Sequence, residues 1–289
     1  MKKPKNENVT GISEILPRTS EWERFRRVFF QRKLVLFGII VLGLLIIAAA
    51  FAPLLAPYDP YQQDMTSSLL KPSAQHLLGT DLFGRDTLSR LIFGGRTALM
   101  VGFISVGVAS IIGILLGVLA AYMGGIVNVI IMRANDTLMS LPLLVMALVI
   151  AALLGSGIQN VIIALTIATI PSYTRTTYGL ALSIKENDYI MAQRGMGSSS
   201  FRTIFLHLIP NAFPPLIVLI TMQLGALILA EAGLSFLGIG IEPPGAAWGA
   251  MVNDGYKYLQ ENPVLSFAPG LSIMLVVFAF NMVGDGLRD

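Results

Sequence analysis

Residues 34–56 read LVLFGIIVLGLLIIAAAFAPLLA and contain no charged side chain. A helix that spans a membrane needs about 20 mostly apolar residues, because the hydrocarbon core is about 30 Å thick and a helix rises about 1.5 Å per residue. The run therefore predicts one membrane-spanning helix. The composition agrees, since only 13% of the 289 residues are charged and the mean hydropathy is +0.72, whereas soluble domains carry about 25% charged residues.

Five further apolar stretches follow, and each is long enough to cross a bilayer. Together the stretches predict an all-α integral membrane protein with six transmembrane helices, near residues 34–56, 97–121, 127–152, 158–181, 211–235 and 264–284. The third stretch carries Arg133 and Asp136, which we expect to form an ion pair at i,i+3 spacing. The second carries Gly113 and Gly117, whose small-xxx-small spacing permits close approach of another helix.

Positive charge predicts the orientation of the chain. Lysine and arginine are concentrated in residues 1–33 and recur in residues 182–210. Because cytoplasmic loops are enriched in these residues, we expect both termini on the cytoplasmic side of the membrane. Residues 20–30 place three aromatic side chains on one helical face among arginines, which predicts a helix lying in the membrane interface, in contact with lipid.

The pattern divides the chain into three parts. We expect a cytoplasmic tail with the interfacial helix in residues 1–33, a first transmembrane helix and a long outer loop in residues 34–96, and a core of five transmembrane helices in residues 97–289. The core holds a cytoplasmic loop, residues 182–210, and an outer loop, residues 236–263. Loops of this length are usually functional.

Several classes of function are excluded by the residues themselves. The chain has no cysteine and only two histidines, His76 and His207, so a thiolate or histidine-built metal site is not expected. No glycine precedes a Lys-Ser or Lys-Thr pair, so the chain lacks a P-loop for ATP. No catalytic constellation and no basic face interleaved with aromatics is present, which argues against an enzyme and against nucleic-acid binding.

The predicted cytoplasmic segment 186–210 reads ENDYIMAQRGMGSSSFRTIFLHLIP. Gly197 suits the position after a helix, where a left-handed conformation is required, and Ser199 or Ser200 can cap the next helix. The pattern predicts a short helix, a turn and a second helical piece that ends at Pro210. Such a projecting helix suits the docking of a soluble partner, and an ordinary loop is the alternative.

This segment resembles the cytoplasmic EAA loop of binding-protein-dependent ABC importer permeases, with strict matches at Ala192, Gly197 and Pro210. Four further stretches resemble the peptide/nickel branch of that family, and most closely its C-type subunit, so that the likeness extends from about residue 20 to 289. These stretches are LLGTDLFGRDTLSRLIFGGRTAL at 77–99, AYMGGIVNVIIMRANDTLMSLP at 121–142, EAGLSFLGIGIEPPGAAWGAM at 231–251 and NMVGDGLRD at 281–289.

The resemblance implies a type I ABC importer permease fold in the bacterial inner membrane. It also implies a second homologous permease subunit, two ATPase subunits that bind ATP and Mg, an external substrate-binding protein, and no cofactor on this chain. Short peptides are the expected substrate, nickel or a metal chelate is the alternative, and an ion-coupled carrier or channel is a further one. The implied ATPase-coupling residues are Asp188, Tyr189, Ala192, Arg194, Gly197, Ser198 and Pro210.

Two further groups of residues are candidates for function. Pro171 in an apolar span frees a backbone carbonyl, and polar residues surround it, so we expect this region to line a pathway, with kinking and packing as the alternative. The pathway or gate candidates are Thr166, Thr169, Pro171, Ser172, Tyr173 and Glu231, the last of which could pair with Arg90 or Arg96. In the outer loop, salt bridging within a turn or contact with the binding protein is expected of Asp81, Arg85 and Asp86.

Overall fold

The computed structural model describes residues 32–288, apart from the side chain of Arg194. The expected tail and interfacial helix, residues 1–33 and 20–30, therefore lie almost wholly outside the described residues. Within the described range the secondary structure is helical, apart from one isolated bridge between Thr80 and Asp86. The predicted all-α class is confirmed.

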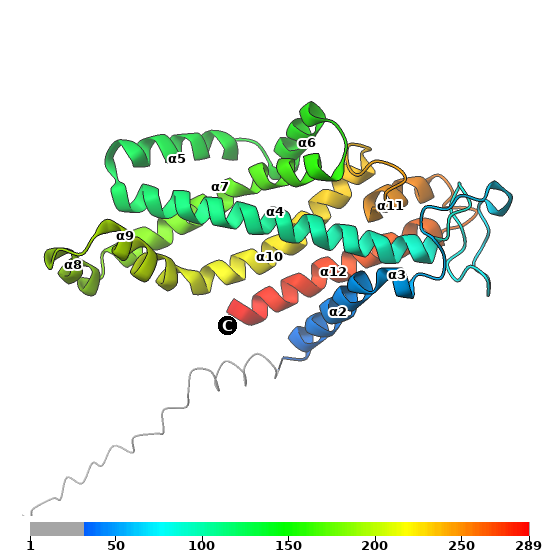
Figure 1. Cartoon of the computed structure of the whole chain (residues 1–289), viewed down its shortest axis with the longest axis horizontal. Coiled ribbons are helices and arrows are strands. Elements are labelled where there is room, and N and C mark those ends of the chain that lie inside the picture. The colour runs from blue at the N-terminus through cyan, green and yellow to red at the C-terminus, as the bar shows by residue number, and fades with distance from the viewer. Residues whose placement is uncertain (1–31, 289) are drawn as a thin grey trace, which may run out of the picture.

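The elements follow in the order α2 (Lys33–Ala50), α3 (Ala52–Leu55), η1 (Met65–Ser67), α4 (Thr87–Met123), α5 (Gly125–Met139), α6 (Leu143–Leu154), α7 (Ile158–Lys185), α8 (Asp188–Gly195), α9 (Ser200–Thr203), η2 (Ile204–Leu208), α10 (Ile209–Phe236), α11 (Trp248–Tyr256) and α12 (Val264–Arg288). Helices α4, α7 and α10 run along the long axis of the molecule (Figure 1). Helices α8 and α9 lie at one end, and α11 with the long loop before α4 lies at the other. The segments predicted as cytoplasmic and as outer thus lie at opposite ends.

Four described helices are long and apolar enough to cross a membrane, namely α2, α4, the continuous segment Ser200–Phe236 and α12. The number becomes five if α5 and α6 together form one span, because these two helices meet at a bend of 90°. The span expected near residues 127–152 is therefore not one continuous helix but two, α5 and α6, and a single span formed by this pair remains a prediction. The bend falls just before Pro142, where a proline disfavours helical backbone in the residue preceding it. Six spans remain a prediction.

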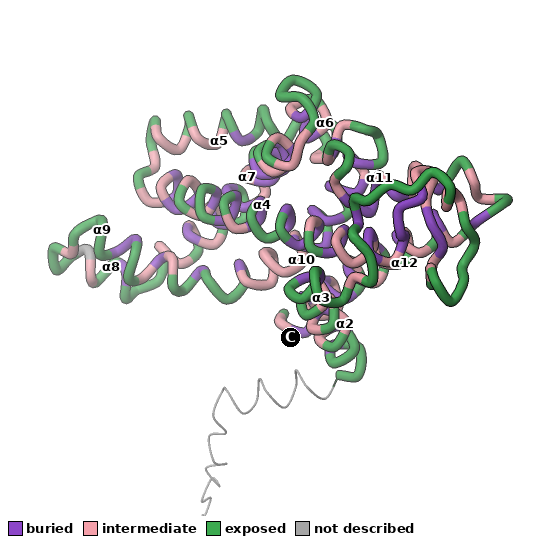
Figure 2. The backbone as a smooth tube through the Cα atoms, turned by 45° about the vertical axis from the view of Figure 1, so that its right-hand side comes forward, coloured by how far each residue is buried: buried purple, intermediate pink, exposed green. Residues whose placement is uncertain are grey.

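Helix α7 falls outside this set because it is the least apolar of the long helices, and its place in the fold explains why. It packs against α4, α5, α6 and α10, so much of its surface faces protein rather than lipid. Figure 2 shows the resulting gradient, with buried backbone concentrated where α4 and α7 lie and exposed backbone along α2 and α5. A central helix can carry threonine, serine and tyrosine because its neighbours cover them.

Two helix boundaries differ from the sequence pattern. Helix α4 begins at Thr87 rather than near residue 97, because the Asp86 carboxylate accepts the Ser89 backbone N–H at 2.8 Å and caps the helix. The second cytoplasmic piece does not end at Pro210 but continues into α10. Pro210 lies in the first turn of α10, where the missing N–H is tolerated, and the π-helical turn η2 directly precedes it.

Close contact between α4 and α7 depends on the two glycines that the sequence singled out. A Cβ atom at Gly113 would lie 2.5 Å from the Cβ of Tyr173, and one at Gly117 would lie 2.6 Å from the carbonyl oxygen of Thr174. Neither position has room for a methyl group, so the backbones meet directly. The predicted packing role of Gly113 and Gly117 is confirmed.

We predict that Gly117→Ala destabilises the protein by about 1–3 kcal/mol, because the added methyl group must push α7 away from α4. The matched control is Gly107→Ala on the same helix, where a Cβ would meet nothing within 4 Å. Thermal unfolding in mild detergent measures both variants. Equal melting temperatures for the two variants would contradict the proposed contact.

Candidate functional site

The α8–α9 end has the turn that the sequence predicts. Gly197 has a φ of +83°, and the Ser198 backbone N–H donates to the carbonyl of Gln193 at 3.2 Å, which closes α8 with a left-handed residue. The Ser199 hydroxyl accepts the Arg202 backbone N–H at 3.3 Å and caps α9. Two short helices thus leave the bundle and return to it through a tight turn.

One side of this projection is anchored and the other is open. Ile190 is fully buried. The side-chain Nε2 of Gln193 lies 2.6 Å from Nε2 of His207, which belongs to η2 just before α10. On the open side Asp188 and Ala192 are exposed, as are the large apolar side chains of Tyr189, Met196 and Phe201, the last of which packs against the ring of Phe205. The surface combines an anchored base with exposed apolar groups, an arrangement typical of a docking surface. The side chain of Arg194 lies outside the described part, and Pro210 is exposed at the start of α10.

The pathway candidates on α7 separate into two faces. Thr166, Thr169, Pro171 and Tyr173 are buried in the bundle, and the Thr169 hydroxyl donates to the Leu165 carbonyl of its own helix at 2.7 Å. Their positions are those of core residues, and a role in lining a pathway stays a prediction for them. Ser172 lies on the other face of α7 and lines an open hollow.

That hollow lies between α7, α10 and α12, with the end of α5 at its edge. Its lining is Met139, Ser172, Arg175, Thr176, Leu219, Met222, Gln223, Ala226 and Asn281. A second hollow shares Leu219 and Met222 with it and extends to Pro214, Pro215 and Arg288 near the end of α12. The two form one groove, which we call the α10 groove. Four of its polar residues, Arg175, Thr176, Gln223 and Asn281, were not among the predicted site residues, although Gln223 and Asn281 interrupt long apolar runs.

An ion pair joins α5 to α7 beside the α10 groove. The guanidinium of Arg175 contacts the carboxylate of Asp136, and both side chains are about half exposed, at 50% and 46%. The expected partner of Asp136 was Arg133, and that expectation was wrong. The bend between α5 and α6 brings α5 alongside α7, so a residue distant in the sequence takes the partner's place.

A network of charges holds the outer loop against the bundle. The Arg85 Nε donates to the Asp81 carboxylate at 2.6 Å, and the Arg90 Nε lies 3.5 Å from the same carboxylate. Arg85 and Asp86 are almost fully buried, so the predicted salt bridge within this turn is present. Contact of Asp81, Arg85 and Asp86 with a binding protein stays a prediction.

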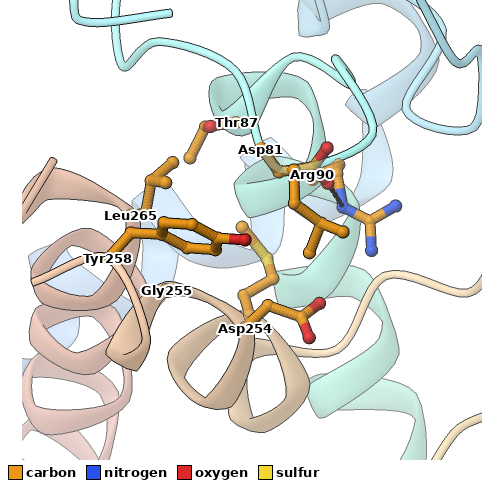
Figure 3. A pocket seen from close by; sticks show the side chains of 9 residues that line it. Asp81, Thr87, Arg90, Asp254, Gly255, Tyr258 and Leu265 are labelled. Carbon is orange, nitrogen blue, oxygen red and sulfur yellow. Dashed lines mark ion pairs between the residues drawn. The ribbon is translucent and has the colours of Figure 1, made fainter. Parts of the chain in front are cut away.

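Arg90 extends this network to the second outer loop. Its guanidinium donates to the Pro60 carbonyl at 3.0 Å and to the Pro244 carbonyl at 3.2 Å, which joins the two loops. Figure 3 shows Arg90 and Asp81 beside Asp254 of α11 around a small pocket. Burial raises the pKa of Asp254, while Arg85 and Arg90 act in the opposite direction.

Glu231 is buried near the outer end of α10. Its carboxylate accepts the Ser235 hydroxyl at 2.7 Å, whereas the Arg90 guanidinium is taken up by Asp81 and the loop carbonyls. The expected pairing of Glu231 with Arg90 or Arg96 is therefore wrong, because among the described residues neither arginine forms an ion pair with it. In the described part of the chain, no group of three or more acidic or histidine side chains is arranged to hold a metal ion.

Comparison with known proteins finds family matches over most of the chain. Residues 113–289 match the family described as binding-protein-dependent transport system inner membrane component. Residues 20–72 match the N-terminal transmembrane domain of oligopeptide transport permease C.

Curated relatives match over nearly the full length. The dipeptide transport system permease protein DppC of Alkalihalophilus pseudofirmus is 39% identical over 93% of this chain and 89% of the relative. The di/tripeptide transport system permease protein DppC of Pseudomonas aeruginosa is 40% identical over 98% of this chain and 95% of the relative. The glutathione transport system permease protein GsiD of Pectobacterium atrosepticum is 40% identical over 93% and 88%.

A chain of the MetNI methionine ABC transporter, solved in inward-facing conformations, is similar in structure with a TM-score of 0.58. The match covers 70% of this chain and 96% of that chain at 21% identity. At this identity the likeness bears on the fold, and it confirms the predicted importer-permease fold. From the family match and the relatives at about 40% identity, we conclude that the chain belongs to the binding-protein-dependent transport system inner membrane components, the permease subunits of bacterial ABC transporters.

Proposed function

We propose that this multi-pass inner-membrane protein forms half of a translocation pathway for short peptides and performs no catalysis itself. The observation that carries the proposal is the α10 groove, where Ser172, Arg175 and Gln223 line a hollow between α7, α10 and α12. Charged and amide groups at this depth are costly against lipid. Such charged and amide side chains are tolerated inside a membrane where they face a water-filled pathway or another protein subunit.

The choice of peptides rests on the relatives. Their names specify dipeptides, di/tripeptides and glutathione, which favours peptides over the nickel or metal-chelate alternative. Selection among peptides belongs to a separate substrate-binding protein that delivers them to the outer face. The outer loops, held rigid by Asp81, Arg85 and Arg90, provide the surface on which we propose that this protein docks, with Asp86 acting through its cap on α4.

The energy for transport comes from two partner ATPase subunits, which bind ATP and Mg. Helix α8 and its turn, from Asp188 to Ser198, form the surface that we propose inserts into a groove on one ATPase. ATP can shift the permease between inward-open and outward-open states only through its different affinity for the two states. Helix α8 would transmit that difference, and a second homologous permease would complete the pathway.

Affinity purification of this chain from native membranes in mild detergent tests the assembly. The proposal expects a sister permease, two ATPases and a binding protein to be recovered, and expects that binding protein to bind short peptides rather than nickel chelates. Recovery of the chain alone, in a form that still conducts or exchanges solute, would support a carrier or channel and overturn the proposal.

We predict that Gly197→Asp weakens ATPase binding while the chain remains in the membrane. The left-handed conformation at Gly197 costs a residue with a side chain about 1–2 kcal/mol, and the carboxylate adds charge to the docking surface. The control is Gly195→Asp, which places the same charge on α8 where no positive φ is recorded. Co-purified ATPase, measured relative to this chain, should fall more for Gly197→Asp. Unchanged recovery and unchanged uptake would refute the prediction.

We predict that the α10 groove contains water in the assembled transporter. The chain has no native cysteine, so a single introduced thiol reports its own surroundings. Ser172→Cys, in the groove, should react rapidly with a charged, water-soluble thiol reagent, whereas Thr169→Cys, on the buried face of the same helix, should not. The mass of this chain after labelling gives the result. A protected Ser172→Cys would place this face against protein or lipid instead.

A further inference from the structure

The ion pair between Arg175 and Asp136 lies well inside α7 and beside the bend that follows α5, because Asp136 is three residues before the last residue of that helix, Met139. About 15 Å of helix separate Arg175 from the end of α7 at Lys185, and Asp136 lies about 16 Å along α5 from Gly125. Both side chains are nevertheless about half exposed. Charges at this depth that faced lipid would be strongly unfavourable. Arg175 is part of the lining of the α10 groove, so the groove is the polar surface that its exposed side faces.

The surroundings of the pair are polar but neutral. Ser172 and Thr176 lie on α7 to either side of Arg175, and Gln223 of α10 and Asn281 of α12 complete the lining. The other charged residue that lines the groove is Arg288, at the end of α12. Arg175 lines the groove, and Asp136, which it contacts, lies one helical turn before Met139 of the same lining. Apart from this pair and Arg288 at the end of α12, the polar groups along the groove are uncharged.

We propose that this pair is an exchangeable contact for the charged ends of a zwitterionic peptide. This inference rests on the function proposed above. The guanidinium of Arg175 would bind the peptide carboxylate, for which its planar donors are suited, and the carboxylate of Asp136 would accept from the peptide ammonium. One ion pair opens and two form. Half-exposed ion pairs contribute little to stability, so the exchange is readily reversible, as a pathway requires.

The pairing also explains how one pathway accepts peptides of different side-chain charge. A lone arginine would retain anionic peptides and repel cationic ones, and a lone aspartate would do the reverse. Together the two groups are neutral overall and favour neither. The charge preference of transport should therefore emerge when one partner is removed.

The test is uptake of Ala-Glu and Ala-Lys by the complete transporter, each normalised to occupancy of the unmodified binding protein. Arg175→Gln leaves Asp136 unpaired and should lower the Ala-Glu to Ala-Lys ratio roughly five- to tenfold. Asp136→Asn should raise the same ratio by a similar factor, and the double variant should restore it. Because the ratio is internal to each preparation, poorer assembly of a variant cancels.

The control is Arg133→Gln, which removes an exposed charge from α5 outside the pair and should leave the ratio unchanged. Equal loss of uptake for the two peptides in both single variants, complete loss included, would show that the pair only holds α5 against α7 and would overturn the inference. If the wild-type transporter carries no peptide, the proposed function itself fails. Wild-type uptake with unchanged ratios in the variants overturns this inference alone.

Discussion

Direct backbone contact between α4 and α7, at Gly113 and Gly117, is the constraint on which the rest of the structure depends. It places α7 at the centre of the bundle, covered on one side by α4. The covered face can then hold Thr169 and Tyr173 without exposing them to lipid. The opposite face remains free, and there Ser172 and Arg175 line the α10 groove. Helix α7 therefore contributes one face to the core of the bundle and the other face to the lining of the α10 groove.

Continuity of helix connects the two ends of the molecule. The segment Ser200–Phe236 is helical throughout, because the π-helical turn η2 before Pro210 continues the helix without a break. It starts beside the α8 turn, passes Gln223 in the groove and ends at the outer loops. A displacement of α8 by an ATPase would thus act directly on a helix that lines the proposed pathway. A continuous helix of this kind can carry a local displacement at its docking end to the rest of the span.

Local features were predictable from the sequence and long-range ones were not. Gly197 and Ser199 depend only on backbone geometry and on a neighbouring N–H, so their turn and cap followed from spacing. Four spans followed from hydropathy, whereas α7 is too polar to be counted as a span in that way and α5 and α6 are separated by the bend before Pro142. The partner of Asp136 did not follow, because Arg175 approaches it only through tertiary packing. The α10 groove was missed for the same reason, since its polar residues come from separate spans.

We expect this chain to carry peptides only as part of an ATP-driven assembly. The most direct measurement is uptake of a labelled dipeptide into proteoliposomes that contain this chain, its sister permease and the ATPases. We predict uptake that requires ATP on the ATPase side and the loaded binding protein on the other side. Uptake that proceeds without ATPases, or that follows an imposed ion gradient, would contradict it.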